Sequence, residues 1–232
     1  MGNPKSKIRN PKSPERVKIH TMPVLALLAL LSVPQDLPKG AIVLFNGKDT
    51  SAWVQPDGKP AAWEIKGDAM EVGGSDIRTK QEFGSYRLHA EFWLPYMPQA
   101  KGQARANSGL YNQGRYEIQI LDSYNNPTYP TGGCGGLYSI KDPDRNAIIR
   151  PEAWNMYDIL FTAAKFDAKG KVIANPRITV WHNGIKIHND VEIIEPEERA
   201  KPLGPHKPKG PILLQNHGNP VRFRNIWIVP ME

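Results

Sequence analysis

Short runs of β-forming residues separated by turn residues recur from about residue 41 onward, and this pattern constrains the fold more than any other feature. Residues 85–95 (SYRLHAEFWLP) alternate most strictly, and a period of two is typical of a strand with one buried face. One face would hold Tyr86, Leu88, Ala90 and Phe92, and the other Arg87, His89, Glu91 and Trp93. No segment keeps helical periodicity over three turns, and 22 prolines and 20 glycines suit many turns. The pattern predicts an all-β fold, a sandwich of two antiparallel sheets.

Turn residues predict hairpins within this pattern. Asn183-Gly184, between two alternating runs, is a strong two-residue hairpin signal because both turn positions favour positive φ. Gln113-Gly114 and Gly67-Asp68 divide two further β-like stretches in the same way. Additional strands are expected at residues 41–45, 157–164, 211–217 and 221–230.

The positions of several aromatic residues follow from this reading. His182 and His188 flank the Asn183-Gly184 turn and are expected to be exposed. Trp181 adjoins the same turn and could be either buried or exposed. Four other tryptophans are expected in the core, as is usual for large aromatic side chains. They are Trp53, Trp63, Trp154 and Trp227.

The first forty residues are predicted to be a leader. Residues 1–21 are basic, and the run 22–33 (MPVLALLALLSV) carries no charge, which is typical of the apolar region of an export signal. That run is too short to span a bilayer, which needs about 20 residues. Residues 1–40 are therefore expected to direct export, with residues 41–232 forming one domain. A disordered tail before an N-terminal strand or helix is the alternative, and translation could start at Met22.

Charge and cysteine content narrow the possible partners. The formal net charge is +7, but residues 1–21 supply +5 of it, so the remainder is nearly neutral and nucleic acid is not expected as a partner. A membrane is expected as a partner only through an uncleaved leader. Cys134 is the only cysteine, so the chain can form no intrachain disulfide. An exported chain without disulfides fits a bacterial periplasm or exterior.

Polar residues interrupt the strand-like stretch YEIQILDSY at residues 116–124. Alternation turns Tyr116, Ile118 and Ile120 toward the core and places Arg115, Glu117 and Gln119 on the other face. Asp122 is out of phase and joins them only if the strand bulges near Leu121.

Two other runs offer polar sets that could share this face. Gln215 and His217 take one phase of residues 211–217, and Arg87, His89 and Glu91 form the polar face of residues 85–95. Gathered on one sheet, these sets would make a concave polar floor, where carboxylate and imidazole can bind a divalent metal or exchange protons. An ordinary solvated sheet face is the alternative, above all for His89 and Glu91, and Asp122 could be a turn residue.

Seven short segments and one tryptophan carry a resemblance to a known family. They are LFNGKD (44–49), Trp53, NSGLY (107–111), YEIQILD (116–122), GGLY (135–138), EAWN (152–155), HNG (182–184) and LLQNHGNPVRFRNIWI (213–228). Together they resemble the 3-keto-disaccharide hydrolase domain family. The resemblance implies a concanavalin-like jelly-roll sandwich and activity on glycosides oxidised to a ketone at C3, in exported proteins of sugar-degrading bacteria.

The implied chemistry assigns roles to the polar residues. A ketone at C3 acidifies the proton on C2, so a base can remove it and expel the C1 substituent, after which water adds back. We expect Glu117 and His217 either to supply the base and acid or to bind a divalent metal, with Asp122 as a third ligand. No organic cofactor is expected. The residues expected to bind the 3-keto saccharide are Asn107, Arg115, Gln119, Gln215, Tyr138 and Glu91, with His89 in a secondary position.

Two other functions remain open from the sequence. The frame Glu117-x-Gln119-x-x-Asp122 resembles the Glu-x-Asp-x-x-Glu strand of laminarinase-like retaining endoglycosidases, although its middle acid is an amide and its last acid is shorter. A retaining pair needs carboxyl groups about 5–5.5 Å apart. A non-catalytic carbohydrate-binding module is the other alternative, because jelly rolls also serve as lectin scaffolds.

Overall fold

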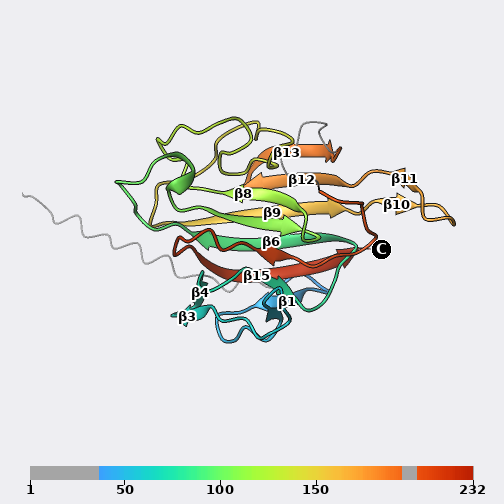
Figure 1. The fold of residues 1–232 in the computed structure, drawn as a ribbon, viewed down its shortest axis with the longest axis horizontal. Coiled ribbons are helices and arrows are strands. Elements are labelled where there is room, and N and C mark those ends of the chain that lie inside the picture. The colour runs from blue at the N-terminus through green and yellow to red at the C-terminus, as the bar shows by residue number, and fades with distance from the viewer. Residues whose placement is uncertain (1–36, 195–202, 232) are drawn as a thin grey trace, which may run out of the picture. The chain divides into compact units, whose positions relative to one another are not determined.

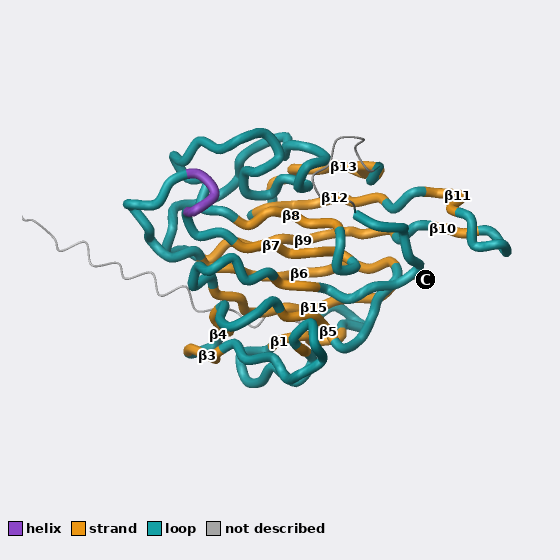
Figure 2. The backbone as a smooth tube through the Cα atoms, viewed as in Figure 1, coloured by secondary structure: helices purple, strands orange, loops and turns teal. Residues whose placement is uncertain are grey.

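The computed structural model describes residues 37–194 and 203–231. The predicted export run at residues 22–33 lies outside the described residues. Among the described residues, no helix is long and apolar enough to cross a membrane. One short 3₁₀ turn, Gly102–Ala104, is the helical element recorded there, and strands make up the rest of the regular structure (Figure 2).

The described strands form two main antiparallel sheets and one small hairpin (Figure 1). The eight-stranded sheet has the order β13-β12-β9-β6-β15-β4-β3, and β1 also pairs with β15. Its strands are β1 (Ile42–Phe45), β3 (Glu64–Lys66), β4 (Ala69–Glu71), β6 (Ser85–Trp93), β9 (Trp154–Thr162), β12 (Arg177–His182), β13 (Ile185–Glu192) and β15 (Arg222–Met231). The five-stranded sheet has the order β2-β5-β14-β7-β8, with β2 (Trp53–Val54), β5 (Ile77–Thr79), β7 (Ser108–Asn112), β8 (Tyr116–Ile120) and β14 (Leu213–Leu214). β10 (Lys165–Phe166) and β11 (Val172–Ala174) pair separately.

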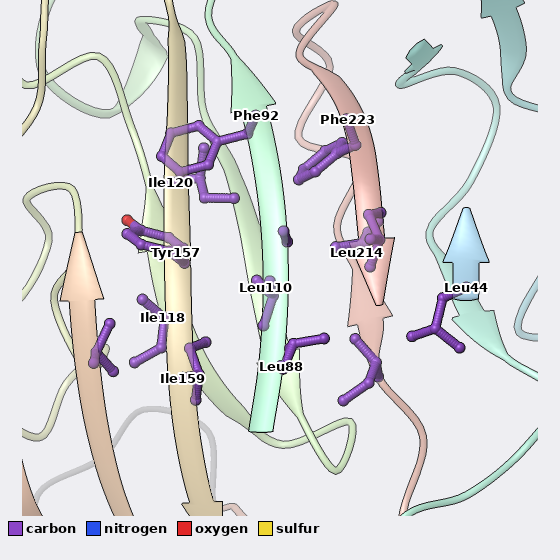
Figure 3. Close-up of a cluster of buried hydrophobic side chains, with 14 of the residues drawn as sticks. Leu44, Leu88, Phe92, Leu110, Ile118, Ile120, Tyr157, Ile159, Leu214 and Phe223 are labelled. Carbon is purple, nitrogen blue, oxygen red and sulfur yellow. The ribbon is translucent and has the colours of Figure 1, made fainter. Parts of the chain in front are cut away.

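The core lies between the two sheets, which confirms the predicted all-β jelly-roll sandwich (Figure 3). The inward residues of β6, such as Leu88 and Phe92, are at most 2% exposed, as the alternation predicted. From the other sheet, Ile118 and Ile120 of β8 meet them. Each such side chain stabilises the fold by about 1.5–3 kcal/mol relative to an exposed position.

The predicted turns are confirmed where positive φ is required. Asn183 and Gly184 have φ of 51° and 78°, and Gln113 and Gly114 have φ of 51° and 67°. The run at residues 211–217 forms only the two-residue strand β14, and β9 begins at Trp154 instead of residue 157.

The expectation that His182 and His188 are exposed is wrong, because both are fully buried. The His182 Nε2 atom lies 3.2 Å from the Asn155 amide oxygen, and His188 Nε2 donates to the Gly135 carbonyl at 2.7 Å. Burial lowers the pKa of both rings, that of His182 to about 3. His182 lies in phase with the buried Ile178 and Val180 and packs on the Phe92 and Tyr157 rings, whereas the loop at Gly135 covers His188.

The glycine-rich stretch TGGCGG runs beside β8, the edge strand of the five-stranded sheet. Gly135 N donates to the Gln119 carbonyl, and Tyr138 N donates to the Glu117 carbonyl. Gly135 has φ of 84°, and a Cβ there would lie 2.4 Å from the Ile187 methyl, so only glycine fits. The stretch therefore closes the edge of β8 next to Glu117.

Candidate active site

The outer face of β8 and β7 forms a polar floor, which we define by Glu117, Gln119, Tyr111, Gly109 and Gln215. Glu117 pairs with Tyr111 and Gln119 pairs with Gly109 across the two strands. Gln215, just after β14, continues the floor because its backbone N–H donates to the Gly109 carbonyl at 3.0 Å. Alternation thus brings Glu117, Gln119 and Gln215 onto one surface, as the sequence predicted.

The Glu117 carboxylate lies at the centre of this floor and is nearly buried, with 6% of the residue exposed. A Cβ atom on Gly109 would be 2.5 Å from Glu117 Oε1, so the carboxylate occupies the space that a side chain at position 109 would take. The Tyr111 hydroxyl donates to this carboxylate and accepts from Gln215 Nε2 at 3.0 Å. Burial and the charge of Glu117 raise the pKa of Tyr111 strongly, so its hydroxyl stays protonated.

A cluster of amides extends the floor beyond Gln119, with Gln103 at its centre. The Gln103 side-chain oxygen accepts from Gln119 Nε2 at 3.1 Å and from Asn107 Nδ2 at 3.2 Å. Its amide nitrogen donates to Thr128 Oγ1 at 2.7 Å and to the Gly132 carbonyl at 2.8 Å. Asn107 Oδ1 and Gln119 Oε1 are buried and accept no hydrogen bond from a described residue. A polar ligand or a water molecule would relieve the cost of these unpaired acceptors.

Two tyrosines stand beside Glu117. The hydroxyls of Tyr129 and Tyr138 are 2.5 Å apart, and the Tyr138 backbone is hydrogen-bonded to Glu117. Burial and the hydrogen bond to Tyr138 raise the pKa of Tyr129, and the Glu117 charge adds to the effect. The structure thus places Tyr138 next to Glu117, as expected for a residue of the same site.

His217 lies at the rim of this region and is exposed. Its loop is held by Asn216 N, which donates to Asp76 Oδ1 at 2.8 Å, and by Asn219 Oδ1, which accepts from Asn107 N at 2.7 Å. No contact between His217 and Glu117 is recorded in the described part of the chain. The pairing of His217 with Glu117 therefore stays a prediction.

No contact between Asp122 and Glu117 is recorded among the described residues. The β7–β8 ladder ends at Ile120, before the position where the bulge near Leu121 is expected, so the bulge stays a prediction. Arg105 holds the Asp122 carboxylate instead, with Nε 3.0 Å from Oδ2. Burial raises the pKa of Asp122, although the Arg105 charge acts to lower it.

The placement expected for Arg115 is wrong. Asn112 pairs with Tyr116, which leaves Arg115 unpaired in a three-residue connection rather than on the floor. Its guanidinium donates to the Pro205 and Gln113 carbonyls and lies 6.0 Å from the centre of the Tyr116 ring. These contacts hold the loop near residue 205 and leave the group turned away from Glu117.

Glu91 and His89 also lie outside the floor. They belong to β6 of the eight-stranded sheet, so the expectation of one floor for all polar sets is wrong. Glu91 accepts from Arg224 Nε at 2.7 Å and from Asn225 Nδ2 at 2.8 Å. Periodicity assigns each residue to a face of its own strand but does not say which sheet the strand joins.

The donors proposed for a divalent metal do not assemble as a set of three. Asp122 is bound to Arg105, and His217 is exposed at the rim. Across residues 37–194 and 203–231, no three His, Cys, Asp or Glu side chains are grouped so that they could hold a metal ion. A metal therefore stays a prediction.

Sequence reasoning missed Tyr111, Gly109 and Gln103. A tyrosine and a glycine within a strand are ordinary, and Gln103 lies in a 3₁₀ turn with no periodic signal. The register of the β7–β8 hairpin would have revealed Tyr111 and Gly109, because they are the direct partners of Glu117 and Gln119. The HNG and EAWN segments have a structural role instead. Asn183 Nδ2 of HNG donates to Asn155 Oδ1 of EAWN at 2.8 Å, which joins the two segments.

This chain is similar to known proteins in sequence and in fold. Residues 40–229 match the model of the 3-keto-alpha-glucoside-1,2-lyase-like domain. A putative glycosyl hydrolase from Parabacteroides distasonis ATCC 8503 is 40% identical, with a TM-score of 0.77, over 83% of this chain and 84% of that chain. A second putative glycosyl hydrolase from the same organism is 21% identical, with a TM-score of 0.63 over 83% and 94% of the two chains, and shows the fold alone. No curated protein gives a significant match. The match over residues 40–229 shows that the chain belongs to the 3-keto-alpha-glucoside-1,2-lyase-like domain family.

Proposed function

We propose that this protein cleaves 3-keto-glycosides by abstraction of the C2 proton, elimination of the C1 substituent and addition of water. The family and the 40% identical putative glycosyl hydrolase support a carbohydrate-active enzyme. The observation that favours this reaction is the Glu117 carboxylate, nearly buried over Gly109 and held by the Tyr111 hydroxyl. A single positioned carboxylate is what proton abstraction next to a ketone requires.

In the first step, Glu117 takes the proton from C2, and the electron pair of that bond moves toward the C3 oxygen. The resulting enediolate then expels the C1 substituent, which leaves with its oxygen and takes up a proton. Water adds to the C1–C2 double bond of the remaining enone, with oxygen on C1 and hydrogen on C2. The sum is hydrolysis without the oxocarbenium-ion-like state of common glycosidases.

The negative charge on the C3 oxygen needs hydrogen-bond donors that are already in place. Tyr138 and Tyr129 offer phenolic hydroxyls beside Glu117, and the raised pKa of Tyr129 keeps its hydroxyl protonated. The amides of Gln119 and Asn107 offer acceptors for sugar hydroxyls, because their side-chain oxygens have no partner among the described residues. Gln215 acts one step away by holding Tyr111.

The position of Asp122 separates this proposal from a retaining endoglycosidase. That mechanism needs a second carboxyl group about 5–5.5 Å from the first. Asp122, the candidate in the strand frame, lies past the end of β8 and is bound to Arg105. The geometry therefore supports elimination over double displacement.

The test measures release of free sugar from 3-keto-trehalose and 3-keto-sucrose. Glu117→Gln should lose at least about a thousandfold in turnover, since the amide cannot accept the proton. Substrate deuterated at C2 should react several-fold more slowly with the wild type. Glu91→Gln, on the other sheet, is the matched control and should keep its activity. Full activity of Glu117→Gln would overturn the assignment, and hydrolysis of an unoxidised β-glucan would favour the endoglycosidase.

A further inference from the structure

The eight-stranded sheet carries a row of aromatic and charged side chains on its outer face, away from Glu117. The pairings join Trp181 to Asp158, Asp158 to His89, and His89 to Trp227, on the adjacent strands β12, β9, β6 and β15 (Figure 1). Neighbouring strands are about 4.8 Å apart, so the backbones of the two tryptophans are about 14 Å apart. Trp227 is buried as expected, with 7% of the residue exposed, but it pairs with His89 and lies on the outer face of the sheet.

A groove of about 400 Å³ lies along this row. Trp181 and Trp227 line it, together with the side chains of Asp158, Arg87 and Leu160. The groove also reaches Gly184 in the β12–β13 turn, where a Cβ atom would contact nothing within 4 Å. This size and the open turn suit a ligand of a few rings better than a single ion or water.

The aromatic walls are held in place by their neighbours. The His89 ring stacks on Trp227, with centroids 5.1 Å apart and planes 12° from parallel. The Lys186 ammonium lies 5.5 Å from the centre of the Trp181 ring. Fixed aromatic side chains lose little conformational entropy when a ligand binds.

The polar groups in the groove retain hydrogen-bonding capacity. Asp158 Oδ1 accepts from His89 Nδ1 at 2.8 Å, and the Asp158 side chain remains 39% exposed, so its second oxygen can accept from a ligand. Burial acts to lower the pKa of His89, but its hydrogen bonds to Asp158 and Glu91 outweigh burial and raise it to about 9. Arg87 is exposed and makes no side-chain hydrogen bond or ion pair with the residues that the structure describes.

We infer that this groove binds a neutral saccharide chain, as a site separate from the polar floor around Glu117. A pyranose ring has an apolar face of C–H groups that packs on indole, and hydroxyls that can donate to Asp158 and accept from Arg87. An apolar protein segment would leave the carboxylate and the guanidinium without partners, which costs free energy. Binding here needs no turnover and does not depend on the proposed reaction.

Titration calorimetry of the full chain tests this inference. The probes are uncharged hexasaccharides of glucose with β-1,3, β-1,4 and α-1,4 linkages. At least one should bind the wild type and Glu117→Gln equally, and Trp181→Ala should weaken its binding at least tenfold. Arg87→Ala, at an exposed position that does not threaten folding, should weaken binding several-fold. Trp181→Ala should still cleave a 3-keto-disaccharide as fast as the wild type.

Several results would overturn the inference. One is the absence of binding by every hexasaccharide, and another is binding that neither Trp181→Ala nor Arg87→Ala weakens. Loss of binding in Glu117→Gln would place the saccharide on the polar floor instead. Light scattering gives the last check: a dimer of the wild type that Trp181→Ala dissociates would make this face an interface between copies. Failure of the 3-keto reaction alone would leave the groove unaffected.

Discussion

The Glu117 carboxylate occupies the space above Gly109, where a Cβ atom would lie 2.5 Å from Oε1. Gly109 is therefore part of the site although it has no side chain. It lets a carboxylate from β8 lean across onto β7, beside the Tyr111 hydroxyl. Glycine within a strand usually weakens it, and a close approach of another group is one reason to keep it.

Gly109→Ala should lower turnover of a 3-keto-disaccharide by about a hundredfold, because displacement of a catalytic group by about 1 Å has this effect. The added methyl group would meet the far ends of Glu117 and Tyr111, which can move, so the free energy of unfolding should change by only about 1 kcal/mol. Urea unfolding and steady-state kinetics measure the two quantities. Gly73→Ala is the matched control, since a Cβ there contacts nothing within 4 Å, and both quantities should stay unchanged. Unchanged turnover in Gly109→Ala would show that the position of this carboxylate does not limit the reaction.

Tyr111→Phe removes the hydroxyl that joins Glu117 to Gln215. The carboxylate then loses a donor that stabilises its ionised form, so the acid limb of the kcat/KM profile should move to higher pH. Turnover at the optimum should fall roughly tenfold to a hundredfold as the carboxylate becomes less well positioned. Tyr96→Phe is the control, because Tyr96 is 62% exposed, and its profile should match the wild type. An acid limb that does not move would show that this hydroxyl plays no part in holding the base.

The parts of the fold that follow from local rules could be predicted from the sequence. The alternation of β6 needs only a strand with one buried face, and Asn183-Gly184 needs only positive φ at two turn residues. β2, β5 and β14 have two or three residues, too few for periodicity to be visible. These strands form because neighbouring strands supply their hydrogen-bond partners. Those partners lie far away in the sequence, so the residues of each short strand do not reveal them.

The candidate site also contains residues that local rules predict and residues that they misplace. Glu117, Gln119 and Gln215 stood out because polar side chains are unusual within strands. Arg115 was misplaced because the β7–β8 connection has one residue more than a two-residue turn, and a shift of one residue moves a side chain to the other face. Glu91 was misplaced because alternation does not say which sheet contains a strand.

His89 should make the stability of the protein depend on pH in the alkaline range. Its pKa is raised to about 9 in the folded chain, against 6.5 as its ordinary value. The folded state therefore favours the protonated ring, and this contribution is complete below about pH 6.5 and is lost as pH rises to about 9. The difference is on the order of 3 kcal/mol. Urea unfolding between pH 6 and pH 10 should show this loss in the wild type and a flatter curve in His89→Gln.

The control for this pH series is His217→Gln, because His217 is exposed and its replacement should leave the wild-type curve unchanged. Parallel curves for the wild type and His89→Gln would contradict the prediction. They would mean that Asp158 and Glu91 do not hold the His89 ring in its charged form.

Asp122→Asn should affect stability more than catalysis. The Asp122 carboxylate is 2% exposed and pairs with Arg105, so Asp122→Asn leaves the Arg105 guanidinium without its carboxylate, which should cost about 2 kcal/mol of unfolding free energy. Turnover of a 3-keto-disaccharide by the folded protein should stay within about twofold, because the Asp122 carboxylate is held by Arg105. Asp144→Asn is the control, an exposed carboxylate paired with Lys141, and should change neither quantity. A loss of turnover by orders of magnitude in stable Asp122→Asn would instead place Asp122 in the active site, and hydrolysis of an unoxidised β-glucan would then make it the second carboxylate of a retaining glycosidase.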